Sequence, residues 1–465
     1  MKNKILIIIA LLFLCVGIDA QTTVASPIVQ GGGFTFTGLL RGLLGMIVIM
    51  GIAYLFSSKK KAISWRLVCF GLLTQIVLAL CILYVPFIQV FFEYLGKAFV
   101  KLLGFTEAGT KYLFKSFISN EIESPLLNFA ITILPTIIFF SALTSIFFYY
   151  GIIQKVVYWI SLGLTRLFKL SGAESLAVAG NIFIGQTESP LLIKEYLEKM
   201  NRSEIMLVMS AGMATMAGGV LALYIKVLGA GDPVQEILYA KHLLAASIMA
   251  APGVVVIAKM FLPQTESISS DVEVSKDKAG SNILDAISNG TSQGVRLAVN
   301  VAGMLLVFIA LITLTNYVFE KIGIWTGLNG LIANITNGNY TELSLQFILG
   351  YAFAPLMWLL GVHSQDIDLV GRVLGEKLIM TELVGYTSLG ELKQAGAFFE
   401  QKSIIMATYV LSGFANFASI GIQIGGIGSI APKRRVMLSQ LGLRAMFAGA
   451  LASLLSATII GTIMG

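Results

Sequence analysis

The sequence predicts an all-α membrane protein built from an inverted repeat. Of its 465 residues, 56% are hydrophobic and only 12% are charged, and the mean hydropathy is +0.85. Soluble domains carry about 25% charged residues, so the composition excludes an ordinary soluble protein. The three cysteines all lie in apolar stretches and imply no disulfide framework. The net charge of +7 reflects basic residues that cluster beside the hydrophobic stretches.

A repeated pattern of polar residues predicts the duplication. The pair Thr187–Glu188 is echoed by Thr381–Glu382, and each pair is followed by a segment that reads Gly-apolar-Ala-polar-apolar-Ala-small. This segment covers 212–218 in the first copy and 413–419 in the second. A chain that twice places a carboxylate and a Gly-interrupted helix at membrane depth is typical of a transporter whose site lies between two repeats.

The N-terminus predicts a bacterial secretory signal peptide over residues 1–20. Basic residues at 1–4 precede a short apolar run at 5–18, and Ala20 is a small residue suited to cleavage. An uncleaved first transmembrane helix is the alternative.

Eight stretches are apolar enough over about 20 residues to cross a bilayer. They are Leu39–Phe56, Leu67–Val85, Phe129–Phe148, Ile205–Leu228, Leu243–Leu262, Leu297–Tyr317, Ile404–Ile427 and Ala445–Ile463. Segments 86–117 and 154–170 mix lysines or arginine with apolar residues, which predicts interfacial amphipathic helices. Segments 173–197 and 343–389 carry Glu, Gln, Gly and Pro within apolar runs, which predicts re-entrant hairpins.

Charge predicts the orientation of these spans. Basic clusters at 59–66, 155–169 and 433–444 belong to the cytoplasm by the positive-inside rule, which puts both termini outside. The polar segment 263–281 predicts a cytoplasmic linker between the repeats. Each repeat has three crossings, an odd number, so the halves must be inverted.

The two glutamates within the hairpins are candidate site residues. A carboxylate at mid-bilayer costs about 2.5–3.5 kcal/mol even on the lenient insertion scale, so an acid retained there pairs with a substrate, an ion or a proton. Placement of Glu188 and Glu382 at an interface or in a loop is the alternative, since the cost then largely vanishes.

The Gly-containing helices supply a partner surface for these acids. Unwinding at their glycines frees carbonyls that coordinate Na⁺ and amides that bind polar groups, although close helix packing also explains the glycines. The six polar candidates include no basic residue, which favours a neutral polyhydroxylated or heterocyclic solute over a carboxylate or phosphate. They are Gln186, Thr187, Glu188, Glu382, Asn416 and Ser419.

No motif in the sequence predicts an enzyme, a metal centre or an ATPase. His363–Asp368 lacks a third strong ligand at metal-binding spacing, and no Walker-A sequence occurs. The sequence favours a transporter of a neutral solute. An intramembrane enzyme or sensor is the rival class. An enzyme would need a nucleophile–base pair, which is not visible.

Long motifs in the same order resemble those of the concentrative nucleoside transporter family. They lie at 185–193 (Gly-Gln-Thr-Glu-Ser-Pro-Leu-Leu-Ile), 212–218, 374–384 (Leu-Gly-Glu-Lys-Leu-Ile-Met-Thr-Glu-Leu-Val), 413–426 and 431–435 (Ala-Pro-Lys-Arg-Arg). The resemblance implies a homotrimeric multi-pass protein of the bacterial inner membrane that imports nucleosides with Na⁺ or H⁺. It implies membrane lipid, and no nucleic acid polymer, as a further partner, and no cofactor besides the coupling ion.

The resemblance also implies a role for each site residue. Gln186, Thr187 and Glu188 would contact the nucleobase, with Val220 packing on it. The ribose would be bound by Glu382, Asn416 and Ser419, with Phe414 lining that side. Na⁺ would be held by the side chains of Asn181 and Thr215 and by the carbonyls of Ile184 and Met216.

The domain division follows from the same resemblance. Residues 38–150 with 297–319 would form scaffold helices, 151–262 the first transport-domain repeat, 282–342 span six with connecting segments, and 343–465 the second repeat. The chain departs from the family at Thr381-Glu382-Leu383, where Asn-Glu-Phe is usual. We therefore expect a Na⁺-coupled nucleoside importer of the elevator type, with a nucleobase or sugar importer as the alternative and H⁺ coupling left open.

Overall fold

The computed structural model describes residues 35–465 except 117–118, 124–127, 270–279, 337 and 339. The elements of this described part are helices, and it contains no extended strand. Seven helical stretches within it are long and apolar enough to cross a membrane, and one of them, 202–229, is interrupted. The signal peptide expected over 1–20 and most of the linker expected over 263–281 lie outside the described residues. The chain forms two compact units, which are described separately.

The larger unit comprises residues 50–304 and 412–456. Its helices are α3 (Trp65–Tyr84), α4 (Pro86–Phe114), α5 (Phe129–Thr132), α6 (Leu134–Tyr149), α7 (Ile152–Phe168), α8 (Gly172–Asn181), α9 (Lys194–Leu197), α10 (Arg202–Ala214), α11 (Gly218–Gly229), α12 (Pro233–Phe261) and α19 (Phe417–Ile430), with 3-10 turns at Lys60–Ala62, Ser189–Ile193 and Pro432–Arg434. The helices α2 (Phe36–Leu55), α13 (Ile283–Thr326) and α20 (Arg435–Met464) each contribute residues to both units.

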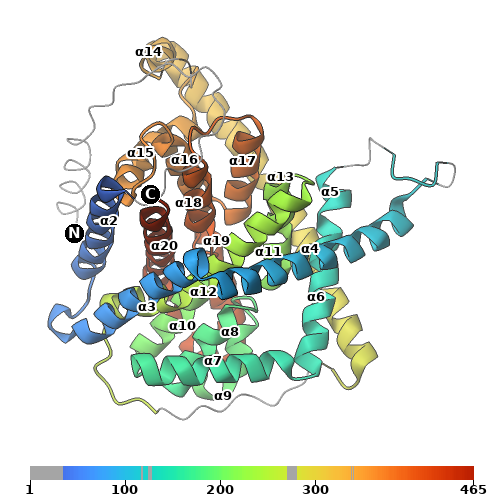
Figure 1. Ribbon diagram of the computed structural model, residues 1–465, viewed down its shortest axis with the longest axis vertical. Coiled ribbons are helices and arrows are strands. Elements are labelled where there is room, and N and C mark those ends of the chain that lie inside the picture. The colour runs from blue at the N-terminus through green and yellow to red at the C-terminus, as the bar shows by residue number, and fades with distance from the viewer. Residues whose placement is uncertain (1–34, 117–118, 124–127, 270–279, 337, 339) are drawn as a thin grey trace. The chain divides into compact units, whose positions relative to one another are not determined.

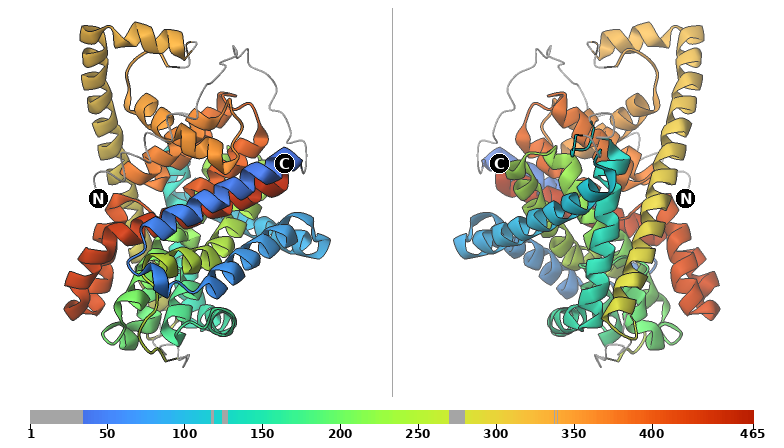
Figure 2. Two further views of the ribbon diagram at one scale, coloured as in Figure 1. Left: turned by 90° about the vertical axis from the view of Figure 1, so that its left-hand side faces the viewer. Right: turned by 90° about the vertical axis from the view of Figure 1, so that its right-hand side faces the viewer.

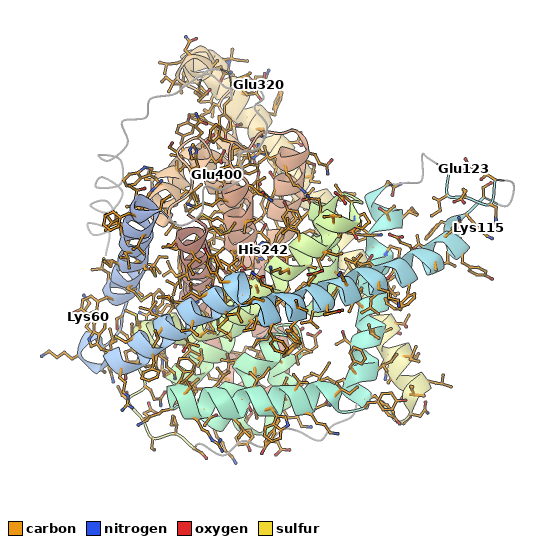
Figure 3. The ribbon with its side chains drawn as sticks, viewed as in Figure 1. Lys60, Lys115, Glu123, His242, Glu320 and Glu400 are labelled. Atoms are coloured by element: carbon orange, nitrogen blue, oxygen red, sulfur yellow. The ribbon has the colours of Figure 1, made fainter. Side chains whose placement is uncertain are left out.

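Helix α12 is the centre of the larger unit. It is 29 residues long, apolar enough to cross a membrane and largely buried, and α3, α4, α10 and α11 all pack against it (Figure 1). The basic turn between α2 and α3 lies beside it at the surface. There Lys60 Nζ is 4.9 Å from the ring centre of Tyr54 (Figure 3), while the backbone N–H of Ser58 donates to Phe261 O at 3.0 Å.

Capping boxes fix where the first hairpin and span four begin. Ser171 and Glu174 satisfy each other's backbone N–H groups at the start of α8, and Asn201 and Glu204 do the same for α10. Such reciprocal caps satisfy backbone donors that have no partner within the helix. Lys259 of α12 joins the two starts, because its ammonium contacts Glu174 and donates to Ser203 Oγ at 3.0 Å.

Glycines let α6 and the first part of α13 pack at close range. A Cβ at Gly294 would lie 2.7 Å from Ile138 Cα, and one at Gly290 would lie 2.8 Å from Ala142 Cα. These distances are shorter than real contacts allow, so only glycine permits the approach. This small-xxx-small seam holds α6 against α13, which continues as one helix of 44 residues (Figure 2).

The smaller unit comprises the described residues of 1–49, together with 305–411 and 457–465. Its own helices are α14 (Leu328–Ile335), α15 (Leu345–Leu360), α16 (Ile367–Ile379), α17 (Glu382–Gln394) and α18 (Gln401–Leu411). Arg41 of α2 donates to Trp358 O at 2.7 Å and to Val362 O at 2.8 Å, which satisfies carbonyls at the end of α15. Asp366 accepts from the backbone N–H groups of Phe399 and Glu400 and so holds the segment before α18.

The expected span Ile404–Ile427 is broken, as the glycines of this segment allowed, with α18 ending at Leu411 and α19 beginning at Phe417. The expected hairpin 343–389 differs from the structure, because it contains three helices, with α15 before the pair α16–α17. The boundary between α15 and α16 falls at the polar residues 363–366. Helices are present where amphipathic ones were expected at 86–117 and 154–170, as α4 and α7. The domain boundaries stay predictions.

The seam between α6 and α13 leads to a stability prediction. Gly294→Val should lower the free energy of unfolding by about 1–3 kcal/mol, because its side chain overpacks the contact with α6. The measurement is the thermal unfolding midpoint of the purified protein in detergent. Gly303→Val is the matched control on the same helix, since nothing lies within 4 Å of a Cβ there. Equal midpoints for the two variants would contradict the seam.

Candidate functional site

The first hairpin of the larger unit carries the Thr-Glu pair on a short irregular turn. Helix α8 ends at Asn181, and the chain turns before the 3-10 segment Ser189–Ile193. Ser189 Oγ donates back to Ala177 O at 2.9 Å, which closes the turn onto α8. The carboxylate of Glu188 lies directly over Gly185, where a side chain would collide with it. The turn therefore presents an accessible carboxylate on a tightly folded backbone.

Span four is broken beside this hairpin. Helix α10 ends at Ala214 and α11 begins at Gly218, and Thr215 between them has an extended backbone (φ −116°, ψ 169°). The freed N–H of Gly218 donates to Phe183 O at 3.2 Å, which holds the break against the hairpin turn. The N–H of Met216 donates to Ser247 Oγ of α12 at 3.4 Å. Backbone groups released by the break thus find partners in the hairpin and in α12.

The residues predicted to hold Na⁺ come from the two segments that this contact joins. Asn181 is 1% exposed, and its Nδ2 donates to Ala177 O at 2.8 Å. Its Oδ1 is buried and accepts no hydrogen bond from the residues that the structure describes. An unsatisfied buried oxygen is costly, and a carboxamide oxygen is a hard ligand that suits Na⁺. Asn181 and Thr215 therefore fit a cation, with Thr215 Oγ1 using its proton on Ala211 O at 2.9 Å.

The second break lies against the first. Asn416 caps α19, with Oδ1 accepting from Ser419 N at 2.8 Å. Gly413 has φ +85°, a conformation that favours glycine, and a Cβ there would lie 2.5 Å from the carbonyl carbon of Ala214. The two Gly-Ala-polar segments that repeat in the sequence therefore touch each other where both helices are unwound.

A buried network of neutral polar side chains joins the hairpin to α19. Gln186 Nε2 donates to Ser419 Oγ at 3.1 Å, and Gln186 Oε1 accepts from Gln423 Nε2 at 3.0 Å. Gln423 Nε2 also donates to Met209 O at 3.0 Å. A polar network buried in this way fixes a single arrangement of its members. It brings Gln186 and Ser419, predicted for base and ribose, within direct contact.

A cavity of about 350 Å³ opens beside the hairpin. Glu188 and Val220 line it, together with residues of α6 and α13. The polar residues that α6 and α13 contribute are Ser141, Thr144, Ser145, Asn289 and Gln293. Binding pockets for small molecules are about 300–1,000 Å³ and combine an apolar lining with a few polar groups. The cavity is therefore large enough to accept a small polar solute next to Glu188.

The ribose-side glutamate belongs to the smaller unit. Glu382 is the first residue of α17 and is 7% exposed. Thr381, which stands where the family usually has Asn, caps this helix by accepting from Val384 N at 3.4 Å. Thr and Asn are both good N-cap residues, so the departure preserves the start of the helix. The contact of Glu382 with the residues of the larger unit stays a prediction. Phe414 and Thr187 are half-buried in the larger unit.

Sequence reasoning missed two polar residues of this site. Gln423 is the centre of the network, and Ser247 contacts both the span-four break and the hairpin, with its hydroxyl 3.5 Å from Ile182 O. Each is a polar side chain with apolar residues on both sides of it in the sequence. That isolation was the available signal, because a polar group kept at membrane depth needs a partner.

Comparison with known families identifies the chain. A family model described as the Na⁺ dependent nucleoside transporter N-terminus matches residues 44–117. A second, described as Gate (nucleoside recognition), matches 130–231, and the C-terminal model of the Na⁺ dependent nucleoside transporters matches 242–461. The chain belongs to the Na⁺ dependent nucleoside transporter family. It is thus a multi-pass membrane protein of a family of transporters, not enzymes.

Two known proteins, a bacterial permease and CNTnw, are similar to this transporter over nearly their whole length. The nucleoside permease NupC of Helicobacter pylori is 36% identical over 433 residues, which are 92% of this chain and 98% of the permease. The structure of CNTnw in an inward-facing substrate-bound state matches with a TM-score of 0.81 at 34% identity, over 92% of this chain and 98% of CNTnw. A CNTnw variant in an outward-facing state also matches with a TM-score of 0.81 at 34% identity, over 91% and 97% of the two chains.

The buried network of this transporter leads to a second prediction. Gln423→Leu should lower the free energy of unfolding by about 1–3 kcal/mol, because Gln186 Oε1 and Met209 O both lose a buried donor. The measurement is the thermal midpoint in detergent. Gln293→Leu is the comparison, since its side chain is exposed in the cavity wall. A midpoint for Gln423→Leu at or above that of Gln293→Leu would show that the network contributes no stability.

Proposed function

We propose that this transporter imports nucleosides across the bacterial inner membrane by symport with a cation, with Na⁺ favoured over H⁺. The observation that carries the proposal is the contact between Gly413 and Ala214, which joins two unwound helices beside the Thr-Glu hairpin. Unwound helices at membrane depth supply ion and substrate ligands in secondary transporters. The family and its relative NupC support nucleosides as the solute.

The nucleobase would be bound on the hairpin side. Gln186 offers a carboxamide that both donates and accepts, as the edge of a base requires. Thr187 and Glu188 would contact the base directly or through water, and Val220 would pack on it from α11. In the present structure Gln186 is bonded to Ser419 and Gln423. The base would therefore either replace one of these hydrogen bonds of Gln186 or add to them. Recognition would then depend on the pattern of donors and acceptors on the base.

The ribose would be bound by Glu382, Asn416 and Ser419, with Phe414 lining that side. A carboxylate accepts hydrogen bonds from hydroxyl groups, and such charge-assisted bonds are stronger than neutral ones. Asn416 and Ser419 lie in the first turn of α19 and are buried. Nucleosides with ribose hydroxyls would therefore bind better than analogues without them, or than free nucleobases.

Cation coupling would arise because one turn carries both ligand sets. Asn181 and Ile184, expected to bind Na⁺, directly precede Gln186–Glu188, expected to bind the base. A cation that orders this turn lowers the cost of binding a nucleoside, and the effect is reciprocal. A proton on Glu188 or Glu382 is the alternative coupling ion.

Alternating access would be of the elevator type, with the hairpins and broken helices moving as one body against scaffold helices in each subunit of a homotrimer. The similarity to CNTnw in both inward-facing and outward-facing states supports a change of this kind. Counterflow of nucleosides in proteoliposomes, with Na⁺ and pH varied separately, tests solute and ion together. Competition of uridine uptake by uracil or ribose as strong as by uridine would favour the nucleobase or sugar alternative.

The orphaned oxygen of Asn181 leads to a prediction about coupling. Asn181→Ala should raise the Na⁺ concentration for half-maximal uridine uptake about tenfold, because one hard oxygen ligand is lost. Initial uptake rates across a Na⁺ series measure this shift. Asn334→Ala, at an exposed position of α14, is the control and should leave the Na⁺ dependence unchanged. An unchanged Na⁺ dependence in Asn181→Ala would remove this residue from the cation site.

The carboxylate of the second hairpin leads to a prediction about uptake. Glu382→Gln should lower uridine uptake at least about a hundredfold with expression intact, since charge-assisted bonds to two hydroxyls are lost. Radiolabelled uridine uptake in a transport-deficient host is the measurement. Glu391→Gln, on the exposed face of the same helix, is the matched control. Near-normal uptake in Glu382→Gln would contradict the role of Glu382.

A further inference from the structure

A lysine is completely buried in the second hairpin. Lys377 of α16 is 0% exposed, and its Nζ donates to Val410 O of α18 at 2.9 Å. Charged side chains at membrane depth are expensive and are kept where they have partners and a function. Arg372, on the same helix, is already paired with Glu376 at 3.0 Å. Lys377 is thus a separate cation, and the roles proposed above leave it unexplained.

The hydrogen bond from Lys377 satisfies a backbone carbonyl at the C-terminal end of α18. Helix α18 ends at Leu411, so the carbonyls of its last turn lack partners within the helix. Lys377 takes one of them, and Tyr386 OH of α17 donates to another, Thr408 O, at 2.9 Å. An ammonium group at a helix C-terminus also offsets the negative end of the helix dipole. Both helices of the hairpin are therefore anchored to the end of α18.

The same hairpin carries Glu382, and the anchors lie on either side of it. Tyr386 follows Glu382 by four residues on α17, so the two side chains share a helix face. Lys377 precedes Glu382 by five residues across the turn, and its Nζ bonds the same end of α18 as Tyr386, so the ammonium group lies on the side of the hairpin that carries Glu382. One ammonium group thus offsets the negative end of α18 and stands on the same side of the hairpin as the carboxylate of Glu382.

We propose that Lys377 is a positioning residue for the ribose: it holds Glu382 as an oriented anion against the end of α18, ready to accept from the ribose hydroxyls. This inference rests on the proposed function. A positioning role for Lys377 can be distinguished from a role in fold stability alone. Loss of an orienting charge weakens the bonds to the hydroxyls selectively, whereas loss of a purely structural bond affects all nucleosides alike.

The test compares uridine with 2′,3′-dideoxyuridine, which lacks both hydroxyls, in proteoliposomes. Wild-type protein should prefer uridine by about tenfold or more in kcat/KM, because charge-assisted hydrogen bonds distinguish the two. In Lys377→Met the preference should fall to about one, through a raised KM for uridine and with the KM for dideoxyuridine within about twofold. Lys377→Arg keeps the charge and should restore most of the preference.

Lys402 provides the matched control in the same unit. It is also a buried lysine whose Nζ donates to a backbone carbonyl, that of Gly465, at 2.8 Å. Lys402→Met should change uptake of both nucleosides by the same factor and keep the preference for uridine. If Lys377→Met does not elute as a single folded species, Lys377→Gln takes its place with the same expectation, because its amide can donate but carries no charge.

A folded neutral variant at position 377 that keeps the wild-type preference for uridine would overturn the inference. An equal loss for both nucleosides would also overturn it, since it would leave Lys377 a structural role only. Wild-type protein that transports neither nucleoside would contradict the proposed function itself, and this outcome is distinct because it precedes any comparison of variants.

Discussion

The structure depends on one constraint, which is that backbone polar groups cannot be left without partners inside a membrane. An unbroken helix meets this constraint by itself, but a broken helix must borrow partners from elsewhere. In the larger unit, backbone N–H groups at the break in span four donate to Phe183 O of the hairpin and to Ser247 Oγ of α12. In the smaller unit, carbonyls at the end of α18 accept from Lys377 and Tyr386. Each break is thereby tied to the hairpin of its own unit.

This pairing explains why the polar residues are few and mostly neutral. Gln186, Ser419 and Gln423 form hydrogen bonds with one another, so they place polar groups in the buried interior without charge. Buried charged side chains have close partners, such as Glu174 for Lys259 and the N–H groups of Phe399 and Glu400 for Asp366. A site of this kind discriminates by hydrogen-bond pattern, because a solute without the right groups leaves buried donors and acceptors unpaired.

The irregular turn after α8 is the link between ion and solute in the proposed mechanism. Asn181 at its start leaves an oxygen unpaired in the described structure, and Gln186 within it belongs to the polar network. A ligand at either position acts on the same few backbone torsions. In the proposed mechanism coupling would need no long pathway, since one short segment would serve both sites.

The sequence by itself determined the membrane class, the helical architecture, the family and the duplicated motifs. These follow from composition and from local patterns, as with the caps at Ser171 and Asn201. The tertiary structure decided where the apolar run 404–427 breaks, that α15 stands before the second hairpin, and that Gly413 meets Ala214. It also brought in Gln423, Ser247 and Lys377, whose roles depend on partners far along the chain. A one-dimensional pattern shows that a buried polar group needs a partner, but only packing in space selects which one.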